Sequence, residues 1–74
     1  MARVLHLLKS GDAALALEVI ARGQAGGDAI TLALLPGAEG VRPPAGVTVR
    51  RVPGDLSYEA LLEAIFEADQ VITW

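Results

Sequence analysis

Residues 3–8 read Arg-Val-Leu-His-Leu-Leu, and residues 29–35 read Ala-Ile-Thr-Leu-Ala-Leu-Leu. Each run is short and largely apolar, and each is followed by turn-forming residues, at 9–12 after the first run and at 36–37 after the second. Strands that are covered on both faces have this pattern, whereas strands with one face in water alternate apolar and polar residues. The two runs therefore predict a mainly parallel sheet and an α/β fold.

Apolar residues recur at helical spacing in two places, once between these two runs and once after the second run. It predicts one helix from Asp12 to about Gln24, with Ser10 or Asp12 as its cap and with Glu18 and Arg22 as an i,i+4 pair. It predicts a second helix that is capped by Ser57 and runs to about Glu67.

The second predicted helix has apolar and acidic stripes. One apolar ridge consists of Tyr58, Leu62 and Phe66, and the next consists of Leu61 and Ile65. Three glutamates recur at i,i+4 spacing on the opposite side, at Glu59, Glu63 and Glu67. Such a stripe of like charges indicates a solvated face.

Two more strands complete the predicted order. Partial alternation over residues 47–52 predicts a third strand that is less buried than the first two, and residues 71–74 predict a fourth. Residues 36–46 contain three of the four prolines and three glycines, which predicts a loop instead of a helix.

The order of elements predicts a four-stranded sheet with helices on both faces. Strands 1 and 3 are expected at the centre, in the order 2-1-3-4. The two helices must then lie on opposite faces, because crossover connections share one hand and the chain steps outward in opposite directions. Because a loop replaces the helix between strands 2 and 3, part of one sheet face is expected to lack a cover. We expect another subunit to pack there.

The composition restricts the class of protein. The 74 residues predict one domain over residues 1–74, and the net charge of −3 argues against direct nucleic-acid binding. No cysteine is present, which excludes disulfides and thiolate metal sites. The apolar runs are too short to span a membrane and no secretory leader is visible, so a cytoplasmic protein without membrane contact is expected.

Few residues are candidates for chemistry. His6 is the only histidine, and a lone histidine in an apolar strand is typical of a core or interface residue. No nucleophile–base pair, metal-ligand spacing or cofactor motif is visible, so no catalytic residue, metal or cofactor is predicted. Trp74 is expected to pack on the sheet or on a partner, and Tyr58 is a further interface candidate.

Lys9, Ser10, Gly11 and Asp12 form the one candidate ligand site. They follow the first strand and precede a helix, where backbone N–H groups and Lys9 favour an anion. The same residues equally fit an ordinary turn and helix cap.

Both ends of the chain resemble a family of sulfur-handling proteins. Leu5-His6-Leu7-Leu8-Lys9-Ser10 opens the chain, Ser57-Tyr58-Glu59-Ala60-Leu61-Leu62 follows later, and Asp69-Gln70-Val71-Ile72-Thr73-Trp74 closes it. In their order and position these segments resemble the DsrH/TusB branch of the DsrE/DsrF/DsrH-like sulfur relay proteins. The resemblance covers roughly half of the chain. Members of the family are usually longer by about a helix in the middle.

The resemblance implies a DsrE/DsrH-like α/β fold and a role in sulfur transfer. Cysteines that are implicated in persulfide transfer in this family have no counterpart here, and a thiolate is required for that chemistry. The implied role is a non-catalytic accessory subunit beside cysteine-bearing DsrE/DsrF-like partners. Their relay would serve either tRNA wobble-uridine thiolation or sulfur oxidation.

Two alternatives remain open at this point. The chain could be a small-molecule or anion-binding α/β module that uses Lys9–Asp12, or a structural homo-oligomer unrelated to sulfur. A free-standing enzyme is disfavoured, because no competent acid–base pair is visible.

Overall fold

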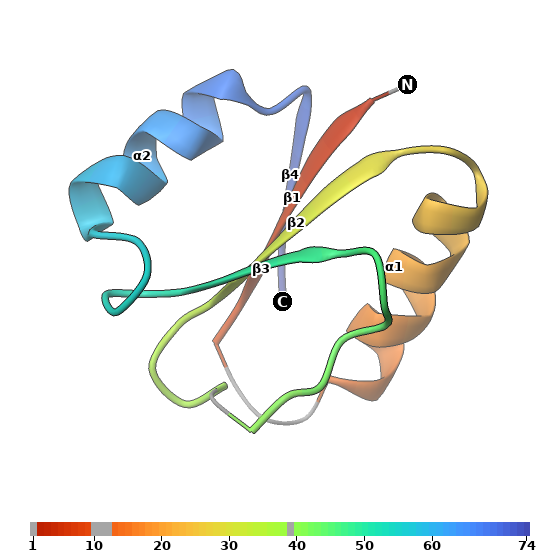
Figure 1. Ribbon diagram of the computed structural model, residues 1–74, viewed down its shortest axis with the longest axis horizontal. Helices are drawn as coiled ribbons and strands as arrows, with labels where there is room; N and C mark the ends of the chain where they lie inside the picture. The colour runs from red at the N-terminus through yellow and green to blue at the C-terminus, as the bar shows by residue number, and fades with distance from the viewer. Residues whose placement is uncertain (1, 10–12, 39) are drawn as a thin grey trace.

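The computed structural model describes residues 2–9, 13–38 and 40–74 (Figure 1). The predicted α/β class and the predicted order of strands and helices are confirmed. The elements are β1 (Arg3–Leu8), α1 (Ala14–Ala25), β2 (Ala29–Leu34), β3 (Thr48–Arg51), α2 (Tyr58–Glu67) and β4 (Gln70–Thr73).

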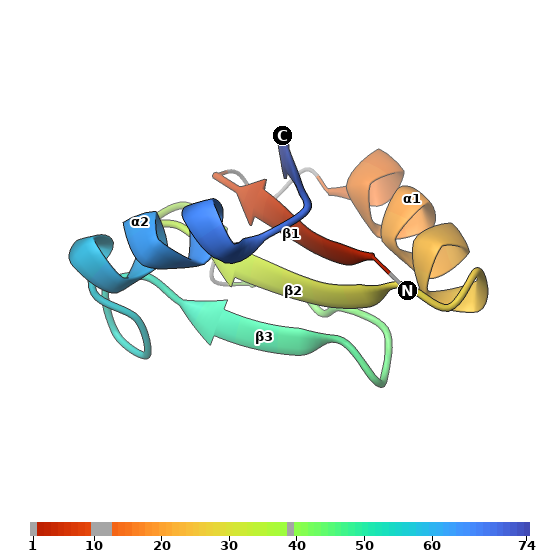
Figure 2. The ribbon, with the colours of Figure 1, turned by 90° about the horizontal axis from the view of Figure 1, so that it is seen from above.

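The four strands form one all-parallel sheet, but their order differs from the prediction. The observed order is β3-β2-β1-β4, not 2-1-3-4, so β1 and β2 are the central strands (Figure 2). The described residues of the connection from β2 to β3 form no helix. Consecutive strands joined in this way are usually neighbours in the sheet. The chain therefore places β3 beside β2 and then crosses back over the sheet through α2 to reach β4.

The two helices cover opposite faces of the sheet, as predicted (Figure 1). Side chains of β1 alternate between the faces, so Val4 and Leu8 pack on the α1 side while Leu5 and Leu7 pack on the α2 side. The crossover through α1 steps from β1 to β2, and the crossover through α2 steps back from β3 to β4. Two crossovers of the same hand that step in opposite directions must lie on opposite faces.

The proline-rich connection covers the face where a third helix would lie. Ala38 is fully buried, and Val41 and Val47 pack against the same core cluster as α1. The side-chain amide of Gln24 on α1 donates a hydrogen bond of 2.6 Å to the carbonyl of Ala45 and so ties the loop to the helix. The loop therefore covers the sheet beside α1 with apolar side chains, at the place where the sequence predicted an uncovered face.

The helix ends agree with the prediction at α2 and differ at α1. Ser57 caps α2, and its hydroxyl accepts a hydrogen bond of 3.1 Å from the amide of Ala60. The N-cap residue of α1 is Ala13, which forms no side-chain capping bond, and the predicted caps Ser10 and Asp12 lie outside the described residues. No described helix is long and apolar enough to cross a membrane.

Candidate functional site

A row of large apolar side chains projects from α2 into solvent. Tyr58, Leu62 and Phe66 are 58%, 53% and 80% exposed, and we call them the α2 ridge. They follow one another at i,i+4 spacing, so they lie on one side of the helix over its whole length. Isolated exposed apolar residues are common on monomeric proteins, whereas a continuous row of this kind indicates a contact surface.

The ridge is exposed because a different face of α2 packs on the sheet. The inward-facing side chains belong to the same core cluster as Leu5 and Ala33, and they are Leu61, Ala64, Ile65 and Ala68. With 3.6 residues per turn, the ridge is offset from this inward face by about one quarter of the helix circumference. The apolar surface of α2 is thus wider than the part that packs on the sheet, and the ridge is the part that stays exposed.

The three glutamates of α2 flank the ridge. Glu59, Glu63 and Glu67 each follow a ridge residue directly in sequence, and all three are exposed, as predicted. No Lys or Arg occurs anywhere in α2. The outer surface of this helix is therefore an apolar row with an acidic border.

His6 and Trp74 form a hydrogen-bonded pair between β1 and the residue after β4. His6 is 2% exposed, and its Nδ1 atom accepts a hydrogen bond of 2.9 Å from the indole Nε1 of Trp74. The two ring planes are nearly parallel, with an angle of 11° and centroids 6.1 Å apart. Trp74 is half-buried against the α1-side core, and its backbone amide also donates to the carbonyl of Leu7.

This hydrogen bond determines the protonation state of His6. Nδ1 can accept a bond from the indole N–H only when it carries no proton, so the imidazole is neutral and its proton is on Nε2. Burial lowers the pKa of His6 below its ordinary value of 6.5, because the charged form loses its hydration. The pair is therefore a structural connection between two strands instead of a free general base.

We expect the free energy of unfolding to fall as the pH is lowered from above 6.5 toward the lowered pKa of His6. The unfolded state binds a proton at His6 near pH 6.5, while the folded state resists it, so the stabilisation is complete above 6.5 and is lost as the pH approaches the lowered folded pKa. Urea denaturation between pH 7.5 and about 5.5 would measure this, since carboxyl groups stay mostly ionised there.

His6→Asn is the matched control for this prediction. Its amide oxygen can accept the bond from Trp74 but does not titrate in this range. The variant should lose most of the pH dependence, even if its stability is lower at every pH. An unchanged slope in His6→Asn would contradict the assignment.

A groove of about 370 Å³ lies next to this pair, between α1 and β4. Val19 and Gly23 form its helix side, and His6 and Ile72 form its sheet side. The groove exists because α1 packs over β1 and β2 and leaves β4 without a helix on this face. Its charged lining residues are Arg22 and Asp28, and Arg22 forms an ion pair of 2.8 Å with Glu18, as predicted.

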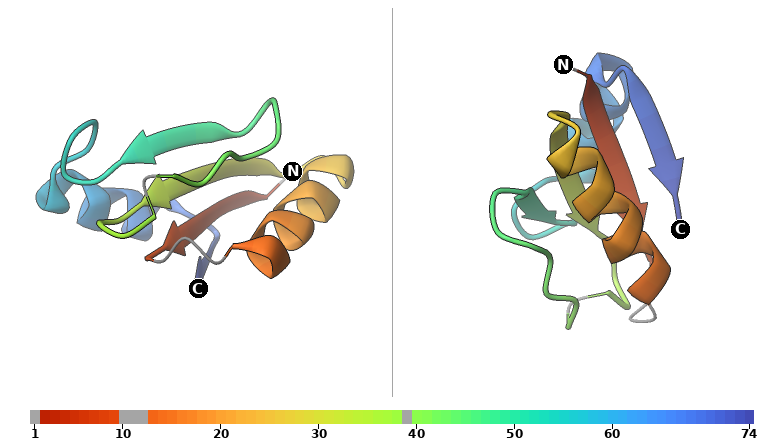
Figure 3. Two further views of the ribbon diagram at one scale, coloured as in Figure 1. Left: turned by 90° about the horizontal axis from the view of Figure 1, so that it is seen from below. Right: turned by 90° about the vertical axis from the view of Figure 1, so that its right-hand side faces the viewer.

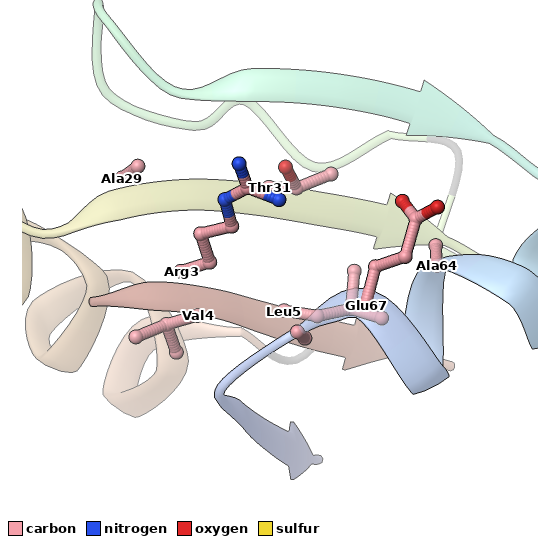
Figure 4. Close-up of a pocket in the computed structure, with 8 residues that line it drawn as sticks. Arg3, Val4, Leu5, Ala29, Thr31, Ala64 and Glu67 are labelled. Atoms are coloured by element: carbon pink, nitrogen blue, oxygen red, sulfur yellow. The ribbon is translucent and has the colours of Figure 1, made fainter.

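A second cavity, of about 290 Å³, lies on the α2 face at the amino ends of the strands (Figure 4). Arg3 of β1 and Thr31 of β2 lie side by side at one end, and Glu67 of α2 lies at the other. The rest of the lining is apolar and includes Leu5 and Ala64. The cavity brings opposite charges to one hollow, but these side chains do not form a nucleophile–base pair.

The predicted ligand site is only partly visible. Lys9 is exposed at the carboxyl end of β1, and Ser10, Gly11 and Asp12 lie outside the described residues. The reversal of strand order predicted beside β1 is present, but the strand at that position is β4 instead of β3. Among the described residues, no group of three His, Asp or Glu side chains is placed to hold a metal ion.

Comparison of the chain with protein-family models, with curated proteins and with solved structures finds no match.

The sequence indicated some of these features and not others. Tyr58, His6 and Trp74 were all interface candidates, and the structure joins His6 to Trp74 but leaves Tyr58 on a separate surface. Arg3 and Glu67 are brought to one cavity although 64 positions separate them. No spacing rule relates two such residues, so only the packing of α2 could reveal the pair.

Proposed function

We propose that this protein is a non-catalytic subunit of a multi-protein complex and that it binds its partner through the α2 ridge. The observation that supports this proposal is the continuous exposure of Tyr58, Leu62 and Phe66. Full burial of a side chain of this size is favourable by about 1.5–3 kcal/mol, so covering the ridge is a substantial driving force for association. Aromatic residues are also enriched in the centres of interfaces.

The chemistry of the chain supports a role without catalysis of its own. The sequence has no cysteine, and its single histidine uses Nδ1 to accept the bond from Trp74. A sulfur atom in transit requires a thiolate carrier. Any persulfide in the complex would therefore be on the partner chain.

We propose that the complex is a sulfur relay and that the partners are cysteine-bearing DsrE/DsrF-like subunits. This part of the proposal rests on the resemblance of three segments, which begin at Leu5, Ser57 and Asp69, to the DsrH/TusB branch. Two of these segments include α2 or its flanks, so the resemblance and the ridge involve the same region. The relay would serve tRNA wobble-uridine thiolation or sulfur oxidation.

The test is binding of the purified chain to DsrE/DsrF-like subunits, measured with the wild type and two variants. Leu62→Glu places a charge in the middle of the ridge and should weaken binding at least tenfold. Leu15→Glu is the matched control, because Leu15 is also an exposed leucine, at 65%, but belongs to α1 on the other face. It should bind like the wild type.

Three results would contradict the proposal. Absence of binding by the wild type would refute the sulfur relay assignment. Equal binding by Leu62→Glu and the wild type would refute the ridge as the contact. Equal losses in both variants would indicate a general effect of charge instead of a specific surface.

A further inference from the structure

β4 is an edge strand that the fold leaves open. Within the described part of the chain it pairs only with β1, and it lies at the margin of the sheet (Figure 3). Val71 is 37% exposed on the α2 side and Ile72 is half-buried on the α1 side. All-parallel sheets normally have both faces of their strands covered, so β4 is exposed to an unusual degree.

The backbone of β4 presents hydrogen-bonding groups to solvent. The amide of Trp74 donates to the carbonyl of Leu7 at 2.9 Å, which fixes the residues of β4 that face β1. Backbone groups alternate along a strand, so those of Gln70 and Ile72 also face β1. The N–H and C=O groups of Val71 and Thr73 therefore point away from the sheet.

The two edges of the sheet differ in charge. The other edge strand, β3, contains Arg50 and Arg51, and Pro53 follows it. Charged residues and proline are devices that prevent edge strands from pairing with other chains. β4, which reads Gln-Val-Ile-Thr, has no charged residue and no proline, so no like-charged side chains within the strand oppose each other when two copies pair.

We propose that β4 pairs in antiparallel fashion with β4 of a second copy of this chain, so that two sheets join into one. A two-fold axis fits because the same edge is then used by both copies. The alternative edge, β3 against β3, would bring arginines against arginines. The neutral edge of β4 is thus the one that is electrostatically compatible with itself.

The outward-pointing groups also select the register. Placing Val71 opposite Thr73 of the second copy uses the N–H and C=O of both residues, in both halves of the dimer. Ile72 then lies opposite Ile72 of the second copy in a non-hydrogen-bonded pair, where side chains approach most closely. Both cross-strand pairs are β-branched, which is favourable in sheets.

This dimer is independent of the proposed binding partner. The two-fold axis is perpendicular to the joined sheet, so both α2 helices lie on the same face of that sheet. The β4 edge that pairs contains no residue of the α2 ridge. Failure of one proposal therefore leaves the other intact, and each has its own readout.

The oligomeric state is the first test. The wild type should sediment with twice the mass of the 7.7 kDa chain at high concentration and dissociate on dilution. Thr73→Pro removes one outward N–H while leaving the bonds to β1, because proline is tolerated in edge strands at such positions. It should be monomeric, whereas Thr73→Val retains the N–H and should still dimerise.

A cysteine scan provides the second test, and it does not depend on the proline variant folding. The chain has no cysteine, so a single introduced thiol can form a disulfide only between copies. In the proposed register the Cα atoms of the two Ile72 residues are about 4.5 Å apart, within the range that a disulfide spans. Ile72→Cys should therefore cross-link rapidly on mild oxidation.

Val71→Cys is the matched control. The two copies of Val71 are diagonal to one another in this register, at about 7–8 Å, so cross-linking should be slow. A wild type that is monomeric at every concentration would overturn the proposal. Faster cross-linking of Val71→Cys than of Ile72→Cys would overturn the register.

Discussion

Leu32→Ala is expected to remove a large share of the stability of the folded protein. Leu32 has no exposed surface and lies in β2, which pairs with β1 on one side and β3 on the other. Removing a buried leucine side chain costs about 2–5 kcal/mol, because apolar contacts are lost and a cavity remains. The whole fold of a chain this size is stable by only about 4–11 kcal/mol.

The effect of Leu32→Ala can be measured by urea denaturation, with Trp74 as the fluorescent probe. Leu15→Ala is the control, since Leu15 is 65% exposed and should change the free energy of unfolding by less than about 0.5 kcal/mol. Leu32→Ala should lower the denaturation midpoint strongly without changing the slope. Similar midpoints for the two variants would contradict the central position of β2.

Gly37→Ala is expected to have the second largest effect on stability. Gly37 has a φ angle of +105°, which non-glycine residues adopt only with strain of about 1–3 kcal/mol. A Cβ atom there would also lie 2.9 Å from the carbonyl oxygen of Lys9, which is closer than real Cβ contacts. Both effects act where the loop passes the carboxyl end of β1, so the backbone must shift to accept the methyl group.

Gly40→Ala is the matched control for this prediction. It lies in the same loop, has no positive φ, and a Cβ atom there would meet nothing within 4 Å. Its free energy of unfolding should stay the same or rise slightly, because alanine restricts the unfolded chain. Thermal unfolding of the two variants side by side measures the difference. If Gly37→Ala is as stable as Gly40→Ala, the close approach to Lys9 is wrong.

Local patterns predicted the elements well because the physical causes are local. The apolar runs at 3–8 and 29–35 produce the two central strands, which are buried on both faces. The serine at position 57 begins α2 through a bond to an amide three residues away. Such features depend on residues that are close in sequence.

Strand order was predicted less well because it depends on a connection and not on a strand. The rule for the hand of crossovers sets which face each helix covers, and it does not by itself fix which strands are neighbours. The described part of residues 36–46 is a loop, as predicted, and it leads to the position next to β2 in the sheet. The observed strand order follows if the connection between β2 and β3, which lacks a crossover helix among its described residues, keeps β3 next to β2.

The candidate contact surface shows the same division. The spacing of Tyr58, Leu62 and Phe66 identified a ridge, but the neighbouring ridge of Leu61 and Ile65 was equally apolar. The orientation of α2 on the sheet decides which of them is buried. That orientation is set by packing against β1 and β2, which lie far away in sequence.

The amino-acid sequence alone determined the fold class, the order of elements, the cap of α2, the ion pair within α1, and the lack of a thiol for sulfur chemistry. Each of these follows from composition or from interactions within about four residues. Tertiary structure alone decided the strand order, the pairing of His6 with Trp74, the exposure of the α2 ridge and the open edge of β4. These features depend on contacts between segments that are far apart in sequence, and those contacts decide which surfaces stay exposed. No pattern within a few residues contains that information.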